Sequence, residues 1–98
     1  MAEIVWTQEA VRWLEEIHDY IAMDRPYAAH DVVTGIYNKV QLLRHQPRLG
    51  QRYAPICDRE VRELLYGHYR IAYLLKSEDR VEVLGIFHAA MDIERYLK

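Results

Sequence analysis

The chain has 98 residues, 51% of them hydrophobic, which is enough for one compact domain over residues 1–98 and too little for two. No apolar run approaches the roughly 20 residues that cross a bilayer, and Glu3 follows Met1 closely, so we expect a cytoplasmic protein with neither a secretory signal nor a membrane contact. The single cysteine, Cys57, excludes an internal disulfide and a zinc site built from cysteines.

The net charge of −2 is unevenly distributed along the chain. Residues 1–30 carry two basic and six acidic side chains, residues 31–76 carry eight and four, and residues 77–98 carry three and five. The middle segment is therefore locally basic, and between positions 44 and 70 every cation is an arginine, whose planar fork suits bidentate contacts to phosphate or carboxylate. A set of solvated surface arginines is the equally probable alternative. These residues are Arg44, Arg48, Arg52, Arg59, Arg62 and Arg70.

A short strand over Glu3–Trp6 and two antiparallel helices are the first predicted elements. Thr7 can cap the first helix, which we expect to end near Met23, because its hydroxyl accepts a hydrogen bond from an unpaired helix N–H. Pro26 suits the start of the second helix, predicted over residues 27–45. Apolar residues at helical spacing should face inward: Ala10, Val11, Leu14, Ile17 and Ile21 in the first helix, and Ala29, Val32, Val33, Ile36, Tyr37, Val40 and Leu43 in the second.

The positions of glycine and proline predict a close contact of the second helix and a long loop after it. Gly35 lies inside the second predicted helix, where glycine costs roughly 1 kcal/mol relative to alanine, so we expect a close helix approach there. Residues 47–59 contain two prolines and a glycine without periodicity, which predicts a loop longer than most in compact domains.

A β-hairpin is predicted over Val61–Tyr66 and residues 69–76, with Gly67-His68 as a type II′ turn. A third strand over residues 81–87 and a short helix over residues 89–98 should follow. Ile93 and Leu97 are expected to face inward from that helix. Together the elements predict an α+β fold, in which an N-terminal strand and an antiparallel helix hairpin pack on a small antiparallel sheet that is followed by a short C-terminal helix.

Alternation along the hairpin assigns its two faces. Leu64, Tyr66, Tyr69, Ile71, Tyr73 and Leu75, with Arg62 at the end, should pack on the helices, whereas Val61, Glu63, Leu65, Arg70, Ala72 and Leu74 should lie on the face that the helices leave uncovered. Arg70 is then a cation in mid-sheet within diagonal reach of Glu63. A half-exposed Arg70–Glu63 ion pair and a site for an anionic partner are about equally supported.

The ordered motifs resemble the RelE/ParE family of small bacterial toxins over essentially the whole chain. The motifs are Pro47-x-x-Gly50, Arg62-Glu63-Leu64, Gly67-x-Tyr69-Arg70-Ile71 and a last strand that ends in His88 before Ala89-Ala90. The resemblance implies the toxin of a type II toxin–antitoxin module, which a small antitoxin neutralises with a disordered, amphipathic tail. It also implies one of two activities: RelE-like members cut messenger RNA on the ribosome, and ParE-like members poison DNA gyrase.

RNA cleavage requires a base, an acid and fixed positive charge at the phosphorane. The resemblance suggests Arg70, Glu63, His88 and Tyr96 as candidates for a metal-independent endoribonuclease. However, Met91 stands where the family's nucleases carry an arginine, and a pI near 6.2 fits poorly with a protein that binds ribosomal RNA. The leading hypothesis is therefore a ParE-like gyrase inhibitor without chemistry of its own, and an inactive antitoxin-binding protein is a further alternative.

His88 has a simpler interpretation as a histidine that hydrogen-bonds backbone at the strand end. Its spacing from Asp92 is only a weak metal signal, so we predict neither a metal nor a cofactor. The exposed sheet face, the helix pair and the arginine-rich loop are candidate surfaces for the antitoxin tail. The candidate residues for binding the antitoxin or the target are Arg48, Arg52, Arg62, Leu65, Arg70 and Leu74.

Overall fold

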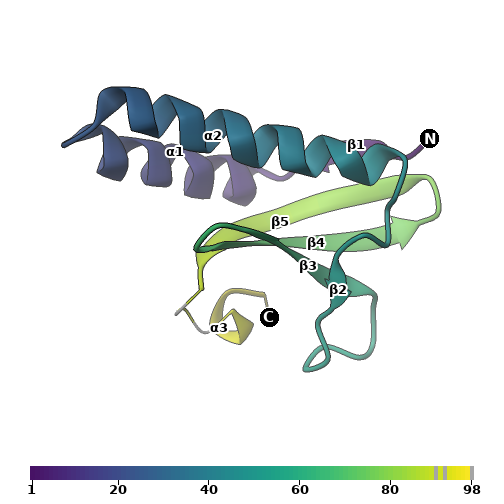
Figure 1. The fold of residues 1–98 in the computed structure, drawn as a ribbon. Coiled ribbons are helices and arrows are strands. Elements are labelled where there is room, and N and C mark those ends of the chain that lie inside the picture. The colour runs from purple at the N-terminus through teal and green to yellow at the C-terminus, as the bar shows by residue number, and fades with distance from the viewer. Residues whose placement is uncertain (90, 92, 98) are drawn as a thin grey trace.

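The computed structural model describes residues 1–89, 91 and 93–97, and it shows an α+β fold in which two long helices lie across one face of a sheet (Figure 1). The five strands of this sheet follow the order β1-β5-β4-β3-β2. The elements are β1 (Glu3–Trp6), α1 (Gln8–Ala22), α2 (Pro26–Gln41), the 3-10 turn η1 (Leu42–Arg44), β2 (Gln51–Arg52), β3 (Val61–Tyr66), β4 (Tyr69–Ser77), β5 (Arg80–His88) and α3 (Glu94–Leu97).

The β3–β4 hairpin has the predicted register, with Tyr66 opposite Tyr69 and Leu65 opposite Arg70. Gly67 adopts a φ of 56°, and no described residue other than glycine has a positive φ. A positive φ at the first central position only is the mark of a type II′ turn, because a type I′ turn would need one at His68 as well. The turn prediction is therefore confirmed.

The N-terminal strand β1 joins the sheet beside the last strand, β5, and runs parallel to it. The sheet is therefore mixed, since all other neighbouring strands are antiparallel. Residues 47–59, predicted to be a loop throughout, contribute β2, in which Gln51 pairs with Glu63 and Arg52 with Arg62. Two residues are too few to leave an alternating pattern in the sequence, so this strand was not predicted.

Thr7 caps α1 as predicted, since its side-chain oxygen accepts a hydrogen bond from the Ala10 N–H at 3.1 Å. The helices cover what we call the helix face of the sheet, where both sides contribute to one apolar core. Two inward predictions were wrong: Val11 is 40% exposed, and Tyr37 is 49% exposed and stacks on Trp6. The buried members of this core are Ala2, Ala10, Ile36, Val40, Leu43, Leu64, Ile71, Tyr73, Leu75, Val81, Val83 and Ile86.

Gly35 marks a close approach of α2, as predicted, and its neighbour there is a side chain of the sheet. A Cβ atom at this position would overlap the hydroxyl end of Tyr66, which rises from β3. The glycine thus makes room for the tyrosine ring between α2 and the sheet.

The opposite side of the sheet, here called the second face, is not left uncovered. Met91 and residues 93–97, here called the C-terminal segment, fold back onto it, and α3 is shorter than the helix predicted over residues 89–98. Ile93 and Leu97 are buried, as predicted, at 1% and 8% exposure, but the face of the sheet that they cover was predicted to be uncovered. Ala90, Asp92 and Lys98 of the predicted helix lie outside the described residues. The buried members of this second core are Val61, Ala72, Phe87, Ile93 and Leu97.

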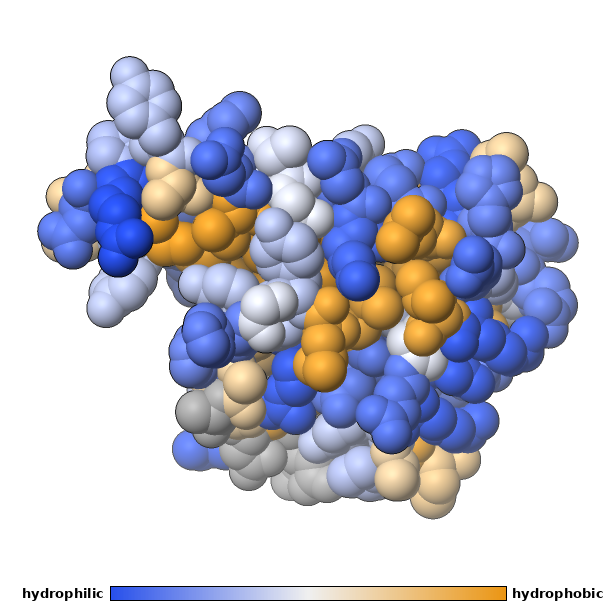
Figure 2. Space-filling model, viewed as in Figure 1, coloured by the Kyte–Doolittle hydropathy of each residue, from blue (hydrophilic) through white to orange (hydrophobic). Residues whose placement is uncertain are grey.

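Hydrophobic patches remain visible on the surface between the helix pair and the sheet (Figure 2). Within the described part of the chain, no helix has the length and apolar character that crossing a membrane requires.

Candidate functional site

Arg70 lies in mid-sheet on the second face, as predicted, between Leu65 of β3 and Phe87 of β5. Its Nη1 lies 3.3 Å from Glu63 Oε2, and both side chains are 19% exposed. Its Nη2 donates to the Met91 backbone oxygen at 2.7 Å. The Nε is buried and has no hydrogen-bond partner among the described residues. The predicted ion pair is therefore present. The prediction that the Arg70 guanidinium is exposed was wrong, because the guanidinium lies beneath the C-terminal segment.

A second arginine holds the other end of this segment. Arg59 Nη2 donates to the Leu97 backbone oxygen at 2.7 Å. Both contacts join a cation to a carbonyl oxygen, and a hydrogen bond to a charged group contributes about 1.5–3 kcal/mol, which is more than a neutral one does. The C-terminal segment is thus fixed over the second face by two apolar side chains, Ile93 and Leu97, and two arginines.

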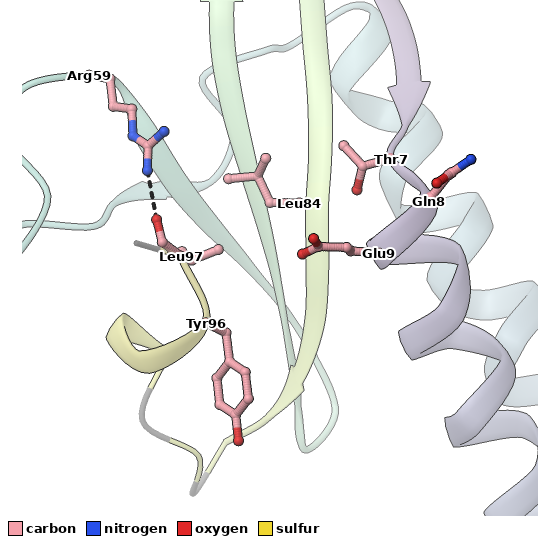
Figure 3. A pocket seen from close by; sticks show the side chains of 7 residues that line it. All are labelled: Thr7, Gln8, Glu9, Arg59, Leu84, Tyr96 and Leu97. Carbon is pink, nitrogen blue, oxygen red and sulfur yellow. Dashed lines mark hydrogen bonds between the residues drawn. The ribbon is translucent and has the colours of Figure 1, made fainter.

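A pocket of about 410 Å³ opens beside this segment, where the first turn of α1 faces the C-terminal residues. Figure 3 shows Glu9 and Arg59 on opposite sides of the pocket with Leu84 between them. Arg59 is already engaged with the Leu97 carbonyl, and the Tyr96 ring contacts Trp13 and Phe87 with centroid separations of 5.2 and 5.5 Å. The pocket therefore combines one carboxylate and one occupied guanidinium, which is not a concentrated charge of either sign.

The four nuclease candidates are divided between the two faces of the sheet. Arg70, Glu63 and Tyr96 belong to the second face. His88 pairs with Tyr69 across the ladder and so projects from the helix face. Its ring lies beside Tyr69 and stacks on His68, with centroids 6.0 and 6.4 Å apart. His88 and Arg70 therefore cannot meet at one phosphate without a rearrangement of the sheet.

The six arginines between positions 44 and 70 are here called the basic zone, and three of them, Arg48, Arg62 and Arg70, form ion pairs with carboxylates among the described residues. Arg48 contacts Glu60 at 3.1 Å and Glu78 at 2.8 Å, and Arg62 contacts Glu60 at 2.7 Å. The hydrogen bond from Arg62, reinforced by Arg48, lowers the pKa of the Glu60 carboxyl. In turn, hydrogen bonds to Glu78 and Glu60 raise the pKa of Arg48. Both predicted binding residues thus have carboxylate partners of their own.

Arg52 differs from its neighbours because it lies exposed on β2 and has no ion pair among the described residues. Leu65 is also exposed, at 62%, near the end of β3. Leu74, predicted to be exposed on the same face, instead packs against the second core. Of the six binding candidates, Arg52 and Leu65 are therefore exposed and outside the ion pairs of the described residues, whereas Arg48 is exposed but paired.

Tyr73 holds the loop before β2 against the sheet, and the sequence offered only the Pro47-x-x-Gly50 spacing as a signal for it. Its hydroxyl donates to the Pro47 oxygen at 2.8 Å and accepts from the Gly50 N–H at 2.9 Å. Arg62 donates to the Gly50 oxygen at 2.7 Å. Burial raises the pKa of Tyr73 although the Gly50 N–H opposes this shift. These contacts fix the backbone from which Arg48 and Arg52 extend.

Trp13 was not singled out from the sequence, yet it contacts both apolar cores. Its ring lies edge-on to Phe87 at a centroid separation of 4.9 Å. Its spacing of three from Ala10 and four from Ile17 fits the inward stripe of the first helix, so periodicity offered a signal that the prediction did not use.

No group of three or more histidine, cysteine, aspartate or glutamate side chains that could hold a metal occurs among the described residues. Asp92, the partner considered for His88, lies outside these residues.

Comparisons with known proteins connect this geometry to one family. The family model described as "ParE toxin of type II toxin-antitoxin system, parDE" matches residues 4–93. A protein from Sinorhizobium fredii (strain NBRC 101917 / NGR234) named as a toxin candidate, Y4kP, is 38% identical over 88 residues, which cover 88% of this chain and 86% of that protein. A solved chain described as "Chromosomal ParDE TA system from P. aeruginosa" shares the fold with a TM-score of 0.76 at 22% identity, covering 90% of this chain and 96% of that chain.

Proposed function

This chain belongs to the ParE family of toxins from type II toxin–antitoxin systems, and from this premise we propose that it acts by binding its target, DNA gyrase, and not by cutting RNA. ParE-like members of the wider RelE/ParE family poison gyrase, whereas RelE-like members cut messenger RNA. Gyrase is a large enzyme with DNA-binding surfaces, so a small toxin can inhibit it through contacts alone.

The division of the nuclease candidates between two faces carries this proposal. Cleavage at a ribose 2′-OH requires a base, an acid and a cation within hydrogen-bond reach, about 3 Å, of one phosphate. Here His88 and Arg70 project from opposite faces of the sheet. The Arg70 guanidinium is in addition engaged with Glu63 and the Met91 oxygen. The arrangement supports a binding mechanism over a catalytic one.

The antitoxin is the second partner that we propose. A tail that orders on binding gains most from surfaces that are exposed and not already neutralised. Arg52 and Leu65 meet both conditions, because they are exposed and no ion pair engages Arg52 among the described residues. Arg48 and Arg62 would first have to exchange Glu60 or Glu78 for the partner's carboxylates.

Supercoiling by purified gyrase tests the proposal directly. The folded chain should block supercoiling or trap cleaved DNA, and prior addition of antitoxin should restore activity. Full supercoiling at a stoichiometric excess of the chain would refute a gyrase target. Messenger RNA sequencing after induction separates the alternatives: codon-specific cuts that Arg70→Ala abolishes would establish a nuclease, and the absence of both effects would leave an antitoxin-binding protein.

A further inference from the structure

The turn between α1 and α2 carries the most exposed large apolar side chains of the helix pair. Tyr20 is 79% exposed, Met23 is 84% exposed and Tyr27 is 88% exposed. We call these three residues the hairpin tip. Figure 1 shows that the helix pair extends well past the end of the sheet, and Figure 2 shows the same end as a lobe that projects from the body of the molecule. The tip therefore reaches beyond both cores.

Folding does not account for these side chains. None of the three belongs to either apolar core or packs against one. Single exposed apolar residues are ordinary, but three within eight positions at a projecting turn form a group. Tyrosine and methionine are also enriched in the buried centres of protein interfaces. The composition and position of the tip thus fit a contact surface.

The tip is held in a defined conformation. The Asp24 and Arg25 N–H groups donate to the Ile21 oxygen at 3.2 and 2.9 Å, and the Ala29 N–H donates to the Arg25 oxygen at 3.0 Å. Pro26 occupies the first turn of α2, where its fixed φ suits the helix. A rigid projection loses little conformational entropy on binding, which raises the affinity that a small contact area can reach.

The charge around the tip specifies the partner. Residues 15–31 contain five acidic side chains and a single basic one, Arg25. An acidic projection is attracted to a basic surface and repelled by an acidic one. Enzymes that act on DNA carry basic surfaces, because neutralising phosphates supplies much of their affinity for it.

We propose that the hairpin tip is the target-binding element, which places Tyr20, Met23 and Tyr27 in an apolar recess on a basic surface of the target protein. The identification of that surface as the DNA-handling surface of gyrase rests on the proposed function. The tip and the basic zone then have separate roles, since the tip faces a basic target and Arg52 faces an acidic antitoxin tail.

The test compares the variant Tyr20→Ser/Met23→Ser/Tyr27→Ser with Leu42→Ala, a matched control in η1 that is 49% exposed and far from the tip in the chain. Both variants should unfold at the wild-type urea concentration and bind antitoxin with wild-type affinity. The tip variant should require at least about tenfold more protein to inhibit supercoiling, and the control should stay within about twofold of wild type. Adding Asp19→Lys and Asp24→Lys in an otherwise wild-type chain should also weaken inhibition.

Three results would overturn the inference. The first is that the folded tip variant inhibits supercoiling as strongly as the wild type. The second is that the tip variant loses affinity for the antitoxin but still arrests growth. The third is that the wild-type chain is a dimer in sedimentation equilibrium and the tip variant is a monomer. If the wild-type chain does not inhibit gyrase, the proposed target fails but the tip is still tested by growth arrest. Loss of arrest in the tip variant would then support the tip with another target, and retained arrest would reject it.

Discussion

The two faces of the sheet are covered in different ways. On the helix face, two long amphipathic helices bury a broad apolar core that includes Ile36, Ile71 and Ile86. On the second face, Met91 and residues 93–97 cover a smaller core and also contact two arginines through the Met91 and Leu97 carbonyl oxygens. The first cover is apolar and extensive, and the second is short and partly polar. From this difference we expect the helix face to contribute most of the stability, and the cover of the second face to unfold locally at a lower free-energy cost.

The largest expected effect is a contrast between two fully buried isoleucines. Ile71→Ala on the helix face should lower the free energy of unfolding by roughly 3–4 kcal/mol, because the rigid helices cannot fill the cavity. Ile93→Ala on the second face should lower the free energy of unfolding by only about 2 kcal/mol, since the short segment that carries it can shift to fill part of the cavity. Their exposed fractions are 0% and 1%, so burial itself is matched. Urea unfolding followed by circular dichroism measures both, and an equal or larger loss for Ile93→Ala would remove the proposed difference.

A smaller effect tests how tightly the helix face is packed at Gly35. Gly35→Ala should destabilise by about 1 kcal/mol, because the overlap with Tyr66 outweighs the gain in helix propensity. In a Tyr66→Leu background the same substitution should instead stabilise by up to about 1 kcal/mol, because only the propensity gain remains. A double-mutant cycle in urea checks this reversal of sign. If Gly35→Ala destabilises equally in both backgrounds, Tyr66 is not the obstacle.

The smallest effect concerns the ion pairs between Arg48, Glu60 and Arg62. Arg62 lowers the pKa of Glu60, so its contribution to stability is present above the unfolded value of about 4.3 and is lost as the pH falls through the lower folded pKa. The contribution should be about 1 kcal/mol or less, since the pair is partly solvated. Glu60→Gln should therefore flatten the decline in unfolding free energy below pH 4.5. An unchanged pH profile in this variant would assign the decline to other carboxyls.

The regular elements on the helix face could be predicted from the sequence because each one is long enough for its hydrophobic period to repeat several times. The helices, the Thr7 cap and the hairpin register follow from spacing and turn chemistry. The pairing of β1 with β5 has no such local signal, because partners far apart in sequence are chosen by the tertiary fold. The short strand β2 lies below the length at which alternation can be seen.

The sequence predicted which residues of the candidate site lie together, but it did not predict which segment covers them. Arg70 and Glu63 form the pair that diagonal spacing suggested. The cover over them was missed, although Val61, Ala72 and Phe87 on the same face needed an apolar partner and Ile93 and Leu97 were available. The face of His88 depended on the register between β4 and β5, which the hairpin alone did not determine.

The pairing of β1 with β5 has a consequence for synthesis of the protein. Glu3 and Arg80 lie opposite each other across 77 positions of chain, so β1 has no partner until β5 has left the ribosome. Contacts of such separation also fold slowly. A product that stops before residue 80 would lack β5, which is the strand that α1 packs against. Only a translation product that extends through β5 can therefore complete this sheet, so no shorter product can form the toxin fold.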